Sequence, residues 1–279
     1  MIKEPNIKTI LREITTAAVL GGRELAKRHQ TRNQLRVHVK TVASDFFTAA
    51  DKASERKIIE HLQSRLPGIV ISSEETPNAV QTITGKLVAE IDPLDGSMAY
   101  KHGQPYYAVS IGIRRNNTMI AGAVYLPALN ELFYASRGKG SYRINTNGKK
   151  PRNPTPLKVR RDKLQNAFVG TDFNYAPETR RVEHREIHGP LLLEARYAPV
   201  LGSSTYGLAQ VAKGNFSAYV HRRLDTQGSA AGILIAREAG AKVTDFNGKP
   251  VKLTEKASSL IVAHPQLHRE ISKLLRRRK

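Results

Sequence analysis

The chain has 279 residues, of which 40% are hydrophobic, so it is long enough to form a large core. Its 45 Lys and Arg residues outnumber the 24 Asp and Glu residues, and the net charge of +21 predicts attraction to polyanions at low salt. The absence of cysteine excludes disulfides, thiol chemistry and cysteine-ligated zinc, so any metal must be bound by oxygen or histidine.

The first part of the chain predicts two helices and two strands. Met1 to Pro5 lacks the basic-then-apolar plan of a secretion signal, and no apolar run approaches the roughly 20 residues of a membrane span. We therefore expect a cytoplasmic protein with no membrane partner. Apolar residues recur at helical spacing from Ile7 to His29, and a second helix is predicted from Asp45 to Leu66. Short strands are predicted from Gly68 to Ser72 and from Lys86 to Ile91.

The middle of the chain predicts one mostly antiparallel sheet. Three strand-like runs follow one another, and Asn116 and Asn117 form the turn between the first two. The runs are Ala108 to Ile113, Ala121 to Tyr125 and Glu131 to Ala135. The stretch from Asn145 to Pro156 is rich in Asn, Gly, Lys and Pro, which favours an exposed connection. We therefore expect an N-terminal lobe, residues 1–145, and a C-terminal α/β lobe, residues 146–279.

Strands and helices alternate in the second half of the chain, which indicates a layered α/β lobe. The predicted strands are residues 166–170, 217–221, 241–245 and 259–263. The predicted helices are residues 178–193, 204–213, 229–239 and 267–277.

Two carboxylates, Asp92 and Asp95, stand three residues apart at the end of the strand that begins at Lys86. A proline fixes the backbone between them, and a glycine allows it to turn away afterwards. Mg²⁺ prefers carboxylate and carbonyl oxygens, so these two acids, the Leu94 carbonyl and a third acid such as Glu74 could form an oxygen cage. An isolated Asp-x-x-Asp pair is more often an ordinary acidic turn, so the metal interpretation depends on the rest of the chain.

Six short motifs, in the same order along the chain, resemble those of the inositol monophosphatase family of metal-dependent phosphomonoesterases. This family lies in the superfamily of fructose-1,6-bisphosphatase and the bisphosphate nucleotidases. The motifs are Phe46-Phe47-Thr48-Ala49-Ala50-Asp51, Ser73-Glu74-Glu75, Asp92-Pro93-Leu94-Asp95-Gly96-Ser97, Tyr100-Lys101-His102-Gly103, Gly202-Ser203-Ser204, and Ala230-Ala231-Gly232 through Glu238-Ala239-Gly240. The resemblance covers nearly the whole chain. Because the six motifs occur in the same order as in the family, coincidence is improbable.

The resemblance implies a layered α-β-α-β-α sandwich of the sugar-phosphatase type, with the active site between the lobes and two or three bound Mg²⁺ ions. It also implies a homodimer, which is common among relatives. The implied metal ligands are Glu74, Asp92, the carbonyl of Leu94, and Asp95.

The resemblance also implies a catalytic role for Asp51 and Ser97, which would orient and deprotonate a metal-bound water. Ser97 stands in for the family threonine and keeps its hydroxyl. The predicted catalytic residues are Asp51, Ser97 and Glu74. The predicted substrate-binding residues are Gly96, Ser97, Gly202, Ser203 and His221. Among these, the backbone N–H groups of Gly96 and Ser97 would hold phosphate oxygens at the start of a helix.

Ordinary structural roles remain open for several residues. Asp51 could simply cap its own helix, and His102 could be a structural hydrogen-bonding residue. Glu75 is expected to be a surface charge. Lys40 matches a lysine near a mobile family loop, yet it is one of 45 basic residues.

The chain departs from the family pattern at Gly228. The family motif Trp-Asp-x-Ala-Ala-Gly supplies an aspartate to the second metal, and here that position is Gly228. We therefore expect the second Mg²⁺ site to be weakened, because ligand charge contributes much of the affinity for a divalent ion. The nearest acid, Asp225, could replace the lost ligand only if the loop before the helix were rebuilt.

The expected substrate also differs from inositol phosphate. His221 replaces a family glutamate that contacts substrate hydroxyls, and Ala99 replaces the usual asparagine. A basic pocket with His221, Arg222 and Arg223 would suit a more anionic ligand, such as a bisphosphate or a nucleotide.

Two functions follow from these observations. The first is Mg²⁺-dependent hydrolysis of a small phosphate monoester, with metal-activated water as the nucleophile. The alternative is a catalytically weakened homologue that binds phosphorylated ligands or nucleic acid. Any polyanion binding should be non-specific, because the basic residues are scattered and the chain has no tryptophan for base stacking.

Overall fold

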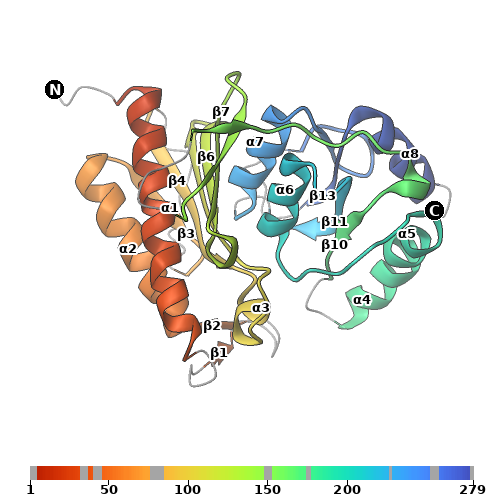
Figure 1. Cartoon of the computed structure of the whole chain (residues 1–279), viewed down its shortest axis with the longest axis horizontal. Coiled ribbons are helices and arrows are strands. Elements are labelled where there is room, and N and C mark those ends of the chain that lie inside the picture. The colour runs from red at the N-terminus through yellow and green to blue at the C-terminus, as the bar shows by residue number, and fades with distance from the viewer. Residues whose placement is uncertain are drawn as a thin grey trace.

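The computed structural model describes residues 5–31, 37–39, 46–75, 85–147, 153–173, 177–225, 228–251 and 258–276. In these ranges the chain forms five layers, which follow one another across the molecule in Figure 1. Two helices cover the outer face of a seven-stranded sheet, two more lie between this sheet and a four-stranded sheet, and further helices cover the far side. This order confirms the predicted α-β-α-β-α sandwich.

The first layer consists of α1 (Ile7–His29) and α2 (Ala49–Arg65), which pack against each other and against the first sheet. The bounds of α1 agree with the prediction, and the side chain of Asn6 caps the helix by accepting the N–H of Thr9 at 3.0 Å. None of the helices in the described ranges combines the length and the hydrophobicity needed to span a bilayer.

The prediction that the second helix begins at Asp45 is wrong; Asp45 itself lies outside the described residues. Residues Phe46–Thr48 form strand β2, which pairs with β1 (Val37–Val39). The helix starts only after Thr48, because the Thr48 side chain and Asp51 form a reciprocal capping box. The cap thereby fixes Asp51 in the first turn of α2.

The seven-stranded sheet is mostly antiparallel, as predicted. Its strands are, in spatial order, β3 (Val70–Ser73), β4 (Leu87–Asp95), β5 (Ala108–Arg115), β6 (Thr118–Leu126), β7 (Glu131–Ser136), β8 (Ser141–Asn145) and β9 (Thr155–Pro156). Only β3 and β4 pair in parallel. Strand β4 is longer than predicted and ends at Asp95, with an irregular register against β5 between Asp92 and Asp95. The irregularity contains Pro93, which cannot donate to a ladder.

The four-stranded sheet forms the fourth layer. Its strands are, in spatial order, β10 (Val169–Thr171), β11 (Ala218–Leu224), β13 (Ser258–Ala263) and β12 (Lys242–Thr244). The helices of the outer layer are α4 (Pro177–Glu183), the π-helical turn His184–His188, α5 (Gly189–Glu194) and α8 (Pro265–Arg276). The mainly helical segment predicted over 178–193 is confirmed, whereas the strand predicted from Asn166 begins at Val169 because residues 164–166 form a 3-10 turn.

The middle layer joins the two sheets into one core. It consists of α6 (Ser204–Lys213) and α7 (Ala230–Glu238), and α7 packs directly on β5, β6 and β7. Helix α7 lies very close to β6: a Cβ placed at Gly122 would lie 3.0 Å from the Cα of Ala231. Apolar side chains of both chain halves therefore share one buried cluster. The 145/146 lobe boundary remains a proposal, and residues 148–152 of the predicted connection lie outside the described ranges.

Candidate active site

A cavity of about 460 Å³ opens between the two sheets, where β3, β4 and β11 end and where α6 and α7 begin. The predicted site residues that line it are Glu74, Asp92, Asp95, Gly202, Ser203 and His221. Gly228 and Asp225 line it too. Residues more than 100 positions apart in the sequence thus meet at one cavity, because the middle helices approach the end of β4.

Asp51 and Ser97 form a hydrogen-bonded pair at the end of β4. Asp51 is only 1% exposed. Its Oδ2 accepts the N–H and the hydroxyl of Thr48, and its Oδ1 lies 3.2 Å from Ser97 Oγ. Ser97 Oγ also lies 3.1 Å from the carbonyl oxygen of Leu94. Burial raises the pKa of Asp51, so this carboxylate holds a proton more readily than an exposed aspartate. Asp51 therefore caps α2 and contacts Ser97 at the same time.

Gly96 and Ser97 stand at the start of a one-turn helix, α3 (Ser97–Lys101), as the motif implied. Gly96 has φ of +93°, a conformation that side chains rarely adopt, and a Cβ there would lie 2.5 Å from the carbonyl oxygen of Tyr106. Glycine is therefore required for the backbone to turn directly after Asp95.

Asp95 holds the start of α6. Its Oδ2 accepts hydrogen bonds from the hydroxyls of Ser203 and Ser204, at 3.1 Å and 3.2 Å, and from the N–H of Thr205. Loss of hydration raises the pKa of Asp95, and the negative charge of Glu74 adds to this rise. The acid of the β4 motif thus connects the first sheet to the middle layer.

The donors around the cavity have the chemistry that Mg²⁺ requires. Glu74 directly follows β3, Asp92 lies in the neighbouring parallel strand β4, and the backbone carbonyl of Leu94 lies between the two aspartates. All are hard oxygen donors. Within the described part of the chain, no group of three or more His, Asp or Glu side chains stands close enough to hold a metal ion. Hydrogen bonds hold both aspartates. Asp92 Oδ1 accepts the N–H of Leu94 at 3.1 Å, and Asp95 is held by the start of α6 as described above.

The backbone at Gly228 faces Asp92. A Cβ placed at Gly228 would lie 3.3 Å from Asp92 Oδ2 and 3.6 Å from Asp225 Oδ2. The carbonyl of Gly228 accepts the hydroxyl of Ser110 at 2.7 Å, which fixes this loop to β5. The carboxylate of Asp225 therefore reaches the space in which a side chain at position 228 would lie. Gln227 lies outside the described residues.

Asp172 is a cavity residue that the sequence analysis missed. It is 7% exposed, and its Oδ1 accepts the N–H groups of Leu201, at 3.0 Å, and of Gly202. Its Oδ2 accepts the hydroxyl of Tyr219 at 2.8 Å. Burial raises the pKa of Asp172 to about 7, and the charge of Asp95 contributes to the rise. Its position two residues after the strand predicted to end at Gly170 was the available signal.

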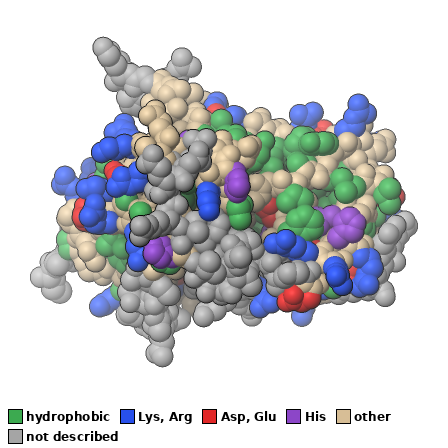
Figure 2. All heavy atoms as spheres, turned by 90° about the horizontal axis from the view of Figure 1, so that it is seen from below, with side chains coloured by type: hydrophobic (Ala, Val, Ile, Leu, Met, Phe, Trp, Pro, Cys, Tyr) green, Lys and Arg blue, Asp and Glu red, His purple; other side chains and the backbone are tan. Residues whose placement is uncertain are grey.

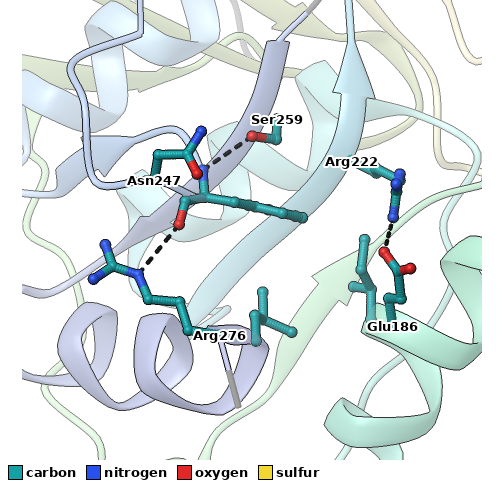
Figure 3. Close-up of a pocket in the computed structure, with 8 residues that line it drawn as sticks. Glu186, Arg222, Asn247, Ser259 and Arg276 are labelled. Atoms are coloured by element: carbon teal, nitrogen blue, oxygen red, sulfur yellow. Dashed lines mark hydrogen bonds and ion pairs between the residues drawn. The ribbon is translucent and has the colours of Figure 1, made fainter. Parts of the chain in front are cut away.

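The expected basic pocket needs a correction. Burial lowers the pKa of His221 to about 4, so the ring is neutral near pH 7, and its Nδ1 accepts the N–H of Arg223 at 3.1 Å. Arg222 does not line the active-site cavity, because successive side chains of β11 point to opposite faces of the sheet. It pairs with Glu186 at a different cavity, shown in Figure 3. The basic residues of the active-site cavity are Arg180 and Arg223.

Among the described residues, the predicted site residues Asp51, Leu94, Gly96 and Ser97 are not part of the lining of this cavity, and neither are Glu75 and His102. His102 is exposed and Glu75 is partly exposed. Lys40 lies outside the described residues.

The sequence and the structure match known proteins over almost their full length. A model of the inositol monophosphatase family matches residues 7–279. The inositol-1-monophosphatase of Bacillus subtilis (strain 168) is 30% identical over 252 residues, 90% of each chain. The Nus factor SuhB of Pasteurella multocida (strain Pm70) is 33% identical over 255 residues, 91% of each chain. The inositol monophosphatase structure from Anabaena (Nostoc) sp. PCC 7120 superimposes with a TM-score of 0.81 at 27% identity, covering 99% of this chain and 98% of that one.

Members of this family are generally metal-dependent phosphatases, and the collinear motifs, the layered fold and the full-length matches agree. The chain therefore belongs to the inositol monophosphatase family.

Proposed function

We propose that the protein is a Mg²⁺-dependent phosphomonoesterase that hydrolyses a small phosphate monoester with water as the nucleophile. The observation that carries this proposal is the pair formed by Asp51 and Ser97 beside a cavity that Glu74, Asp92 and Asp95 share. A buried carboxylate next to a hydroxyl and to further acids is costly for stability, and such an arrangement is typical of a site that handles protons or cations.

A bound ion and the residues of the chain would perform different parts of the reaction. When bound, Mg²⁺ would lower the pKa of a coordinated water and neutralise negative charge on the phosphate and on the leaving oxygen. Glu74, Asp92, Asp95 and the Leu94 carbonyl would hold it. Ser97 Oγ donates to Asp51 Oδ1, which leaves lone pairs of Ser97 Oγ to accept a proton from an attacking water. The raised pKa of Asp51 makes its carboxylate a better final acceptor for that proton.

We propose two or three Mg²⁺ ions, with Asp225 in place of the carboxylate missing at Gly228. Asp225 Oδ2 would lie 3.6 Å from a Cβ at position 228, so it is close to where the family aspartate would begin. The second ion would then have three protein carboxylates near it, from Asp92, Asp95 and Asp225. The sequence-based alternative, an empty ligand position and a weakened second site, makes opposite predictions for variants of Asp225 and Gly228.

The substrate phosphate would be bound by backbone N–H groups at helix starts. The N–H groups of Gly96 and Ser97 open α3 and would hold phosphate oxygens. Gly202 and Ser203, the N-cap of α6, line the same cavity, and the N–H of Gly202 already donates to Asp172. His221 is uncharged, so it would offer a hydrogen bond rather than a positive charge. Arg180 and Arg223 in the same cavity favour a ligand with a second anionic group, such as a bisphosphate or a nucleotide.

We further propose a cytoplasmic homodimer with a general attraction for polyanions. The C-terminal sheet and its helices expose four apolar side chains, Leu192, Leu193, Tyr197 and Val200. In Figure 2 hydrophobic side chains gather toward that end of the molecule, whereas Lys and Arg side chains are spread over the face that is shown. A cluster of exposed apolar residues is a common mark of an interface with a second copy.

The direct test is phosphate release from a panel of inositol phosphates, sugar phosphates and nucleotide bisphosphates over a range of Mg²⁺ concentrations. Wild-type protein should release phosphate in a Mg²⁺-dependent manner, and Asp51→Asn and Ser97→Ala should each lower kcat by about 10²-fold or more. Lack of release at every Mg²⁺ concentration, together with retained binding of the same compounds, would support the alternative of a binding protein. The observation that favours this alternative is the absence of a carboxylate at Gly228.

A further inference from the structure

The side of the C-terminal sheet that carries α8 has a second cavity, with a volume of about 550 Å³. It shares no lining residue with the candidate active site. Its positively charged lining residues are Lys242 of β12 and Arg269, Lys273 and Arg276 of α8. The described residues that line it include no acidic and no large apolar side chain. We call this cavity the α8 groove.

The three basic residues of α8 point in one direction. They stand at positions i, i+4 and i+7 of the helix, a spacing that places them on a single face. Lys242 approaches from β12 on the other side of the groove. Lys242, Arg269 and Lys273 are exposed, and none of the four cations forms an ion pair in the described part of the chain.

The acids nearest in sequence are occupied by backbone N–H groups. Asp245 Oδ1 accepts the N–H of Lys249 at 2.7 Å, at the turn after β12. Glu270 Oε2 accepts the N–H of Leu164 at 2.8 Å, on another side of α8. These hydrogen bonds hold both carboxylates on backbone N–H groups, and neither forms an ion pair with the groove cations among the described residues.

Arg276 is held by the backbone. Its Nε lies 3.4 Å from the carbonyl oxygen of Phe246, a contact that Figure 3 shows reaching from α8 to the turn after β12. A Cβ at Gly248 would lie 2.8 Å from Nη2 of Arg276, so glycine leaves the space that the guanidinium group occupies. An arginine whose orientation is fixed loses less entropy when it binds a phosphate.

The pKa of the buried residue His268 responds to the positive charges around the groove. Burial lowers the pKa of His268 to about 4, and the positive charges of Lys242 and Arg276 contribute to this shift. The neighbouring cavity of Figure 3 shares Arg276 with the groove, but its other cation, Arg222, is paired with Glu186. The α8 groove therefore carries more positive charge than that cavity.

We propose that the α8 groove binds the phosphodiester backbone of a nucleic acid without reading its base sequence. At a rise of about 1.5 Å per residue, Arg269 and Arg276 are separated by about 10 Å along α8. A nucleic-acid strand carries a phosphate about every 3.4 Å along a duplex axis, so about three phosphates can face these cations. The described lining includes no Phe, Tyr or Trp side chain for base stacking, its one ring, His268, is buried, and it includes no apolar side chain for insertion into a membrane. This inference gives a location to the proposed attraction for polyanions and does not depend on the phosphatase reaction.

The test compares two triple variants of equal charge. The groove variant carries Lys242→Glu, Arg269→Glu and Lys273→Glu, all at exposed positions. The control carries Lys8→Glu, Arg23→Glu and Lys27→Glu on the exposed side of α1, at the other end of the molecule (Figure 1). Each variant lowers the net charge from +21 to +15, because every reversal removes two charges. Binding is measured by fluorescence anisotropy with two labelled oligonucleotides of unrelated sequence, each about 20 nucleotides long, at about 50 to 200 mM KCl.

The groove variant should bind both oligonucleotides at least tenfold more weakly at about 100 mM salt, and its slope of log K against log salt should be shallower by about 3. The control variant should lose less than about threefold. Equal losses in both variants, or unchanged binding in the groove variant, would overturn the proposal. So would displacement of the oligonucleotide by inorganic phosphate alone, or tighter binding to anionic vesicles or to polyglutamate. Phosphate release and thermal stability should be unchanged in both variants, so failure here is distinguishable from failure of the proposed enzyme.

Discussion

Burial changes the charge of individual residues around the active-site cavity. The pKa of His221 falls to about 4, that of Asp172 rises to about 7, and that of Asp51 also rises. Each shift favours the neutral form, because a charged group loses hydration when packing removes it from water. The cavity is therefore less charged near pH 7 than its residue types suggest, which leaves Arg180 and Arg223 as its basic groups.

The titration of Asp172 should be visible in protein stability. Its pKa in the folded protein is about 7, above the ordinary value of 3.8, so the fold favours the protonated form. The associated stabilisation is complete below about pH 4 and is lost as the pH rises through about 7. Asp172→Asn removes this titration, so the stability of the variant relative to wild type should increase from pH 4 to pH 8, by at most about 4 kcal/mol. Urea unfolding at several pH values measures this difference.

The matched control is Asp172→Leu. Asparagine can still accept the N–H groups of Leu201 and Gly202 through its carbonyl and can donate to the Tyr219 hydroxyl, whereas leucine loses all three hydrogen bonds and leaves Leu201 N–H with only its bond to the Thr171 carbonyl. Asp172→Leu should therefore be less stable than Asp172→Asn at every pH. A pH profile for Asp172→Asn that runs parallel to wild type would show that Asp172 does not titrate in this range.

The roles of Asp225 and Gly228 can be separated by a pair of variants. If Asp225 replaces the family ligand, Asp225→Ala should weaken Mg²⁺ binding and raise the Mg²⁺ concentration required for activity by about tenfold or more. Gly228→Asp alone should then be neutral or harmful, because its carboxylate would be crowded by Asp92 and Asp225. Isothermal titration with Mg²⁺ and phosphate release measure the two effects independently.

The opposite result would support an empty ligand position. In that case Gly228→Asp tightens Mg²⁺ binding while Asp225→Ala changes little. The double variant adds a check, since a carboxylate at position 228 should rescue the loss of Asp225 only if both reach the same ion.

At the scale of secondary-structure elements, the site depends on the close packing of α7 against the first sheet. Gly112 and Gly122 lie on neighbouring strands under α7, and a Cβ at either would be within 3.5 Å of an atom of Ala231 or Met119. Asp95 and Asp172 hold the segment that leads into α6 from two sides, through residues 203–205 and 201–202 respectively. These contacts position the starts of α6 and α7 at the cavity.

Gly122→Val should therefore disturb both stability and the site. A Cβ at position 122 would lie 3.0 Å from the Cα of Ala231 and 3.2 Å from its carbonyl oxygen, so α7 must move. We expect a loss of about 1 to 3 kcal/mol in the free energy of unfolding, with a further loss of Mg²⁺ affinity because Gly228 and Asp225 shift with the helix. Ala26→Val, at an exposed position of α1, is the control and should cost about 0.5 kcal/mol. Unchanged stability in Gly122→Val would contradict the close approach.

At the scale of the whole molecule, the exposed apolar residues predict a dimer. Leu193 is 76% exposed, and Leu192 and Tyr197 are each 58% exposed. Large apolar side chains that remain this accessible gain stability when a second copy covers them. Leu193→Glu should convert the dimer to a monomer in light scattering after size-exclusion chromatography, whereas Ile7→Glu, at an exposed apolar residue of α1, should not. A monomeric wild-type protein at micromolar concentration would exclude this interface.

Local patterns in the sequence are enough to predict several parts of this fold. The bounds of α1 and α6, the antiparallel sheet and the motif from Asp92 to Ser97 could be predicted, because helical periodicity, strand alternation and the Pro-Gly turn act over a few residues. The start of α2 could not be predicted from the helical pattern, because residues 46–48 pair with β1 and Thr48 caps the helix.

Which distant residues meet, and how strongly each is buried, depends on the packing of the whole chain. It placed the carboxylates of Asp225 and Asp92 on either side of the space beside Gly228 and set Asp172 under the start of α6. These outcomes depend on the packing of α6 and α7 between two sheets, over separations from 29 residues, for Asp172 and Leu201, to 136, for Asp92 and Gly228. Hydration lost on packing then set the pKa of His221 and of Asp172, and no local pattern in the sequence carries that quantity.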